Sequence, residues 1–136
     1  MNEDAVAARA RPKFVYLIIW STVLGGLVAV YLLFAREREA APRDGTGLTL
    51  AVSAVAPLLV SIVVRWLVLP KHTDARKALP LFIIGLATGE ACGILGIFFG
   101  GPWADHFFAL GLLAVVQYAP FLLPKLFQPQ EPPLRG

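Results

Sequence analysis

Four apolar stretches, separated by short charged or turn-forming segments, restrict the folds that this chain can adopt. They span residues 14–34, 48–69, 79–99 and 103–123. A helix that crosses a bilayer needs about 20 mostly apolar residues, and each stretch is about that long. The first stretch has no charged residue, and the third has one, Glu90. The pattern predicts an all-α membrane protein with four transmembrane helices packed as an antiparallel bundle.

The composition also favours a bilayer over a soluble core. Hydrophobic residues make up 57% of the 136 residues and charged residues only 15%, whereas soluble domains are about 25% charged. Such a short chain has no soluble core large enough for several long apolar stretches. The basic balance, with a pI near 9.4, could indicate nucleic acid, but most basic residues flank the apolar stretches, where membrane topology explains them. We therefore expect a lipid bilayer as partner and no nucleic acid.

The first two stretches each allow another interpretation. Residues 14–34 could be a signal peptide, but the apolar part of such a peptide has typically about 7–15 residues, so we expect a retained span. Residues 48–69 are rich in β-branched side chains, but an open sheet edge is not tolerated in lipid, so we expect a helix. Pro57 cannot donate a hydrogen bond to the carbonyl of Ser53, which predicts a kink there.

The connecting segments suggest how the helices are joined. Residues 100–102, Gly-Gly-Pro, suit a tight turn followed by a helix start, so the third and fourth helices should be antiparallel neighbours. Residues 1–13 are expected to form a polar cytoplasmic tail. Residues 124–136 are rich in proline and are expected to be a disordered tail.

The distribution of lysine and arginine predicts the orientation. If the four helices alternate in direction, nine of the twelve basic residues lie on the side of both chain ends, and three, Arg36, Arg38 and Arg43, lie opposite. The more basic side is normally cytoplasmic. This predicts a multi-pass protein of the cytoplasmic (inner) membrane with both ends inside. Arg65 should extend towards the headgroups beside Trp66, and Trp103 should mark the outer boundary.

Small residues recur at helical spacing on two stretches. Close approach of helix backbones in a membrane favours such residues. On this basis we expect helix packing along two lines of residues, which are Ser21, Gly25 and Ala29 on the first stretch and Gly85, Gly89, Gly93, Gly96 and Gly100 on the third. This is more close-packing surface than one four-helix bundle needs, so we expect association with itself or with subunits of a larger membrane complex.

Glu90 is the main candidate for a functional residue. It lies eleven residues into its stretch, roughly 16 Å deep at helical rise, where an ionisable group costs about 2.5–3.5 kcal/mol and often marks an ion or proton pathway. We expect the protonated form at rest. Ser53, Ser61 and Thr88 could complete an ion or proton site with it. A neutral Glu90 that only bonds another helix remains the alternative, and a salt bridge to Arg65 is disfavoured by a depth difference of about 10 Å.

Residues 85–96 read GLATGEACGILG. This segment resembles the carboxylate-bearing helix of the proteolipid (c) subunits of rotary ATP synthases, in which small residues surround the ion-binding carboxylate. The resemblance implies that Glu90 would take the place of that carboxylate. In that family, as here, a cytoplasmic loop precedes the carboxylate helix. The resemblance covers about a dozen residues, and we interpret it as an indication of local chemistry and not of common ancestry.

The remaining reactive residues do not suggest catalysis. His72 and His106 should lie on opposite sides of the membrane, and Cys92 is the single cysteine, so neither a metal site nor a cofactor is expected. The chain has no nucleophile elbow, phosphate-binding loop or HExxH motif. We therefore predict no enzyme, but a structural or accessory membrane subunit. The alternative is proton or cation translocation through Glu90.

Overall fold

The computed structural model describes residues 3–34 and 53–128, and every regular element within them is helical. This confirms the all-α prediction for that part of the chain. Four α-helices form the body of the fold, which are α1 (Glu3–Phe34), α3 (Val55–Val63), α4 (Ala75–Phe99) and α5 (Ala104–Val116). Five short helical turns extend or connect them, which are the π-helical η2 (Val64–Val68) and the 3-10 turns η3 (Leu69–Lys71), η4 (Gly101–Trp103), η5 (Pro120–Leu122) and η6 (Pro124–Phe127).

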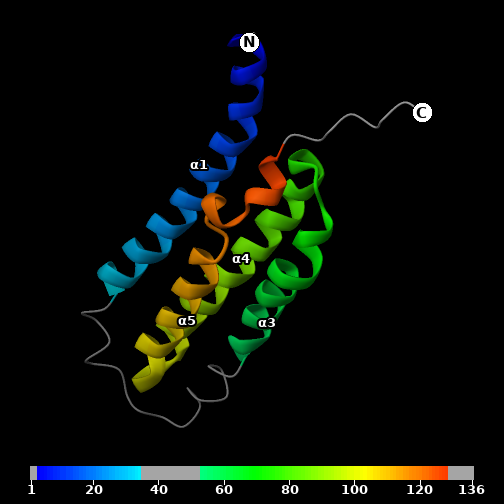
Figure 1. Cartoon of the computed structure of the whole chain (residues 1–136). Coiled ribbons are helices and arrows are strands. Elements are labelled where there is room, and N and C mark those ends of the chain that lie inside the picture. The colour runs from blue at the N-terminus through cyan, green and yellow to red at the C-terminus, as the bar shows by residue number, and fades with distance from the viewer. Residues whose placement is uncertain (1–2, 35–52, 129–136) are drawn as a thin grey trace.

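The helix α4 lies at the centre, with α1 on one side, α3 on the other and α5 along its length (Figure 1). Gly96 of α4 packs on Phe107, near the turn to α5, while Gly85 packs on Tyr118 at the far end. The two helices are therefore antiparallel neighbours, as the Gly-Gly-Pro turn predicted. Tyr16 of α1 bonds to Ala75, at the start of α4, so α1 runs parallel to α4.

The fourth helix is shorter than predicted. It ends at Val116 rather than at residue 123, because proline disfavours a helical conformation in the residue before it and lacks an N–H. Ala119, which precedes Pro120, is accordingly extended in ψ, at 131°. The chain then folds back over the end of the bundle as η5 and η6.

The amino-terminal helix starts earlier than the predicted span. Helix α1 begins at Glu3, so most of residues 1–13 is helical, in keeping with the high helix propensity of its alanines and arginines. Pro57 falls in the first turn of α3, and the helical conformation is interrupted at Ala54, just before it. The residues before Ser53, which would form the other arm of a kink, lie outside the described residues, so the kink at Pro57 stays a prediction. A further irregular turn lies at η2. Residues 48–52 of the second predicted span lie outside the described residues.

The carboxyl-terminal tail is ordered further than predicted. Residues 124–127 form the turn η6, and Leu126 is buried. The prediction of disorder is therefore wrong for these residues, because Leu126 closes the apolar core at this end. The rest of the predicted tail, from residue 129 on, lies outside the described residues.

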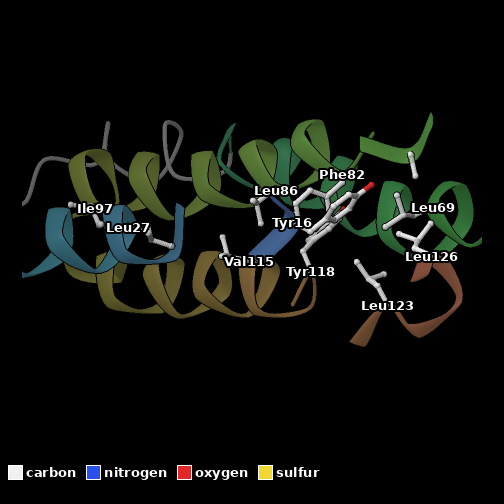
Figure 2. Packing of buried hydrophobic residues seen from close by; sticks show 11 residues of the cluster. Tyr16, Leu27, Leu69, Phe82, Leu86, Ile97, Val115, Tyr118, Leu123 and Leu126 are labelled. Atoms are coloured by element: carbon white, nitrogen blue, oxygen red, sulfur yellow. The ribbon is translucent and has the colours of Figure 1, made fainter. Parts of the chain in front are cut away.

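The core is narrow and runs the length of the bundle (Figure 2). Three rings, those of Tyr16, Phe82 and Tyr118, pack against one another at its centre. Leu69, Leu123 and Leu126 close one end of the core, and Leu27 and Ile97 lie towards the other (Figure 2). Many large apolar side chains remain outside it on all four α-helices, as expected of a surface that faces lipid.

Two helical segments are long and apolar enough to cross a membrane. They are Pro12–Phe34 and Ala75–Phe99, with mean hydropathies of 2.3 and 2.0. Gly101–Val116 is apolar but shorter. Helix length and composition thus point to a membrane protein with two candidate spans, and the four-span arrangement stays a prediction.

Candidate functional site

Glu90 points from the middle of α4 towards α1. One of its carboxyl oxygens lies 3.7 Å from the position that a Cβ atom would occupy on Gly26, an ordinary contact distance, so the carboxyl group lies beside Gly26. The side chain is half-buried and makes no hydrogen bond or ion pair with any residue in 3–34 or 53–128. An apolar helical segment therefore holds a carboxyl group without a polar partner in the described structure.

Ser61 lies on a different side of α4 from Glu90. It is fully buried, and its hydroxyl donates to the carbonyl of Gly85 at 2.8 Å. Its own carbonyl accepts a hydrogen bond of 2.5 Å from the hydroxyl of Tyr118. Ser61 therefore joins α3 to α4 and to the segment after α5, which is a packing role.

Thr88 and Ser53 do not bond to Glu90 either. The hydroxyl of Thr88 bonds back to its own helix, to the carbonyls of Ile84 and Gly85 at 3.0 Å each. Ser53 is exposed at the start of the described segment, two helical turns before Ser61. The structure thus does not gather the four predicted residues into one cluster around the carboxyl group.

The glycines of α4 are used for packing within the chain. All five, Gly85, Gly89, Gly93, Gly96 and Gly100, are buried. Gly89 faces Ser61 and Ala114, and Gly93 faces Leu27 and Gly111. This face packs closely, and its neighbours within the described residues belong to α1, α3, α5 and the segment after α5 of the same chain.

The second small-residue line, on α1, faces outward. Ser21, Gly25 and Ala29 are all exposed, and a Cβ atom on Gly25 would have no neighbour within 4 Å. The opposite side of the helix packs on the bundle through Tyr16 and Leu27. Only 6% of the most apolar part of Pro12–Phe34 is buried, so this ridge is a free helix surface within the described structure.

Arg65 turns inward and does not extend towards headgroups as predicted. Its exposed fraction is 9%. Its Nε donates to the carbonyl of Gln117 at 2.7 Å, and its Nη2 donates to that of Leu122 at 2.9 Å. The last carbonyls of a helix lack partners within the helix, and a cation there is also favoured by the helix dipole. Arg65 therefore stabilises the end of α5.

The two predicted interfacial tryptophans lie near opposite ends of α5. Trp66 is 62% exposed, stacks near the guanidinium of Arg65 and donates a hydrogen bond of 3.0 Å to the side chain of Gln117. Trp103 is half exposed just before α5 and contacts His106. Their place at the two membrane boundaries stays a prediction.

Sequence reasoning missed the aromatic groups that bridge the helices. The Tyr16 hydroxyl donates to the Ala75 carbonyl at 2.6 Å, and the Trp20 indole donates to the Val115 carbonyl at 3.0 Å. Tyr118 is fully buried in the space beside Gly85. The sequence did contain an indication of this. A tyrosine hydroxyl or tryptophan N–H within an apolar stretch needs a hydrogen-bond partner, which in lipid has to come from another part of the protein.

Comparison with known proteins found no family model, no curated protein and no solved structure that matches this chain. The resemblance of residues 85–96 to the proteolipid subunits of rotary ATP synthases thus stays a local one. The function has to be inferred from the chain's own surfaces and side chains.

Proposed function

We propose that this chain is a four-span protein of the cytoplasmic membrane that serves as a structural or accessory subunit, associating with itself or with a larger membrane complex. The observation that supports this proposal is the outward ridge of α1, formed by Ser21, Gly25 and Ala29. The residues around the ridge are mostly apolar, and the absence of a side chain at Gly25 leaves a recess in it.

A line of small residues with a recess favours packing against another helix over contact with lipid. Apolar side chains gain little by leaving lipid, so helices associate in membranes through close backbone contact and van der Waals packing. The glycine face of α4 is already filled by the chain's own helices. The α1 ridge has the same spacing of small residues but no neighbour at Gly25, which makes it the surface at which we place the partner helix.

A larger side chain on the α1 ridge should weaken the association of this chain with its partner helix. In Gly25→Leu and Ala29→Leu variants the larger side chains would hold a partner helix away, and we expect an oligomer about tenfold weaker. Ala87→Leu is the matched control, because Ala87 is an equally exposed small residue on α4. The measurement is cross-linking and size in mild detergent. An oligomer that survives both ridge variants, or that Ala87→Leu disrupts equally, would exclude the ridge as the contact.

The second candidate function is proton or cation translocation through Glu90. The supporting observation is that its carboxyl group, in a candidate span, is half-buried beside Gly26 and has no hydrogen bond or ion pair within the described residues. A carboxyl group that exchanges protons or ions has to be accessible in this way, whereas a purely structural one would be bonded to another helix.

Labelling with a hydrophobic carbodiimide tests this candidate. Protonated Glu90 should react, and Glu90→Gln should abolish both labelling and any ion flux in reconstituted vesicles. Gly26→Leu should cover the carboxyl group and slow labelling, while Gly25→Leu, at the neighbouring open position, should not. If Glu90 is inert and Glu90→Gln leaves flux and assembly unchanged, translocation through this residue is ruled out.

A further inference from the structure

A hollow of about 260 Å³ opens at the end of the bundle where α5 stops. It lies between η2 and η3 on one side and the turns η5 and η6 on the other. Its floor is formed by Leu69, Leu123 and Leu126, which lie together at one end of the core (Figure 2). The hollow exists because Pro120 ends α5 early and the chain folds back beside η2.

Three basic side chains line this hollow, and none of the described residues that line it is acidic. They are Arg65, His72 and Lys125, from three separate turns of the chain. Two N–H groups of Arg65 are fixed on the carbonyls of Gln117 and Leu122. Its other N–H groups make no hydrogen bond within the described residues. A guanidinium held in this way is a preorganised donor for an oxyanion, above all phosphate.

End-capping of α5 explains Arg65 but not the other two residues. The side chains of His72 and Lys125 make no hydrogen bond or ion pair within residues 3–34 and 53–128. Arg65 and Lys125 carry positive charge, and no acidic side chain among the described lining residues pairs with them, so an anion in the hollow would be attracted by charge that its lining leaves uncompensated.

The position of the hollow favours a lipid as the source of the anion. Trp66 and Leu122, which border it, are large and exposed, and Phe121 beside them is 66% exposed. The basic residues Lys71, Arg76 and Lys77 lie exposed at the same end of the bundle. The hollow thus lies where an apolar surface meets a basic one, which is where a phospholipid places its phosphate and the first part of its acyl chains.

We propose that this hollow binds one anionic phospholipid, with its phosphate group against Arg65, His72 and Lys125 and its acyl chains along Trp66 and Leu122. The inference rests on the proposed membrane location. It differs from a general attraction of basic residues to anionic membranes, because it assigns the binding to residues of one hollow and not to the net charge of that end of the protein.

Native mass spectrometry of the full chain, released from nanodiscs of mixed phosphatidylglycerol and phosphatidylcholine, tests this proposal. We expect one phosphatidylglycerol to be retained in preference to phosphatidylcholine. His72→Gln combined with Lys125→Gln should weaken its retention about tenfold. The control, Arg76→Gln combined with Lys77→Gln, removes at least as much charge from exposed residues of the same end that do not line the hollow, and it should leave retention unchanged. Arg65 is not substituted, because it also holds the end of α5.

Each other outcome overturns the proposal in a distinct way. Equal losses in the two double variants would mean diffuse attraction to the membrane surface. Displacement of the lipid by inorganic phosphate alone, with the same dependence on His72 and Lys125, would identify free phosphate as the ligand. Equal retention of both lipids by a folded, inserted chain would exclude the site while leaving the proposed function intact. A chain that stays soluble and monomeric without detergent would instead remove the proposed function itself.

Discussion

Gly111→Ala should destabilise the folded chain by about 2–3 kcal/mol, the upper part of the range for overpacking a well-packed site. A Cβ atom at residue 111 would lie 2.5 Å from the Cα and 2.6 Å from the backbone nitrogen of Gly93. Backbone atoms cannot rotate away as a side chain can, so α4 and α5 would have to separate. The backbones of α4 and α5 therefore meet directly at this point, and the contact between the two helices would loosen.

Gly25→Ala is the matched control, because it adds the same methyl group to a helix but in open space. No atom lies within 4 Å of the new Cβ atom, and alanine is favoured over glycine in a helix by about 0.5–1 kcal/mol, so this variant should be neutral or slightly stabilised. Unfolding of both variants in detergent, followed by circular dichroism, gives the comparison. If Gly111→Ala unfolds at the same denaturant concentration as the unchanged chain, α4 and α5 do not touch at this point.

The helix-packing part of the fold could be predicted from the sequence because it depends on periodicity. Glycines at spacings of three and four identify one face of a helix, and the structure buries that face throughout. The short Gly-Gly-Pro turn likewise makes the two helices that it joins, α4 and α5, antiparallel neighbours. Neither pattern says whether the helix that covers a small-residue face belongs to the same chain. Here α4 and α1 have similar patterns, but the face of α4 is buried within the chain and that of α1 is exposed.

The candidate ion site was predicted less well. The position of a residue along an apolar stretch gives its depth, but it does not say which neighbouring helix the side chain faces. Ser61 donates a hydrogen bond on the α3 side of α4, and Thr88 donates one to the backbone of its own helix. Glu90 faces α1 instead. Direction depends on which helices pack where, and a single sequence contains no signal for that between segments joined by long loops.

The error on Arg65 has a similar cause. Arg65 lies near the end of an apolar stretch, where a long basic side chain normally extends to the headgroups and water. The carbonyls that it binds belong to Gln117 and Leu122, more than 50 residues away, and they are available only because Pro120 ends α5. The proline was visible in the sequence, but its effect on a residue in another helix was not.

Arg65→Met should therefore destabilise the chain by about 3 kcal/mol or more, since each of the two hydrogen bonds involves a charged donor and is worth about 1.5–3 kcal/mol. Methionine keeps the unbranched apolar stem of the side chain and removes the donors, so the carbonyls of Gln117 and Leu122 would be left without partners at the end of α5. The contact between Trp66 and Gln117 should loosen as well. Arg65→Lys should be intermediate, because an ammonium group does not reproduce the planar fork of a guanidinium.

Hydrogen exchange tests whether Arg65 holds the end of α5. In Arg65→Met, exchange should increase at the amides of residues 117–123, whose backbone hydrogen bonds form the turns after α5, while the centre of α4 stays protected. Arg76→Met is the control, because Arg76 is exposed and its side chain makes no hydrogen bond within the described residues, and substitutions of this kind change stability by about 0.5 kcal/mol or less. If Arg65→Met is as stable as Arg76→Met and the turns after α5 remain protected, the guanidinium does not hold that end of the bundle.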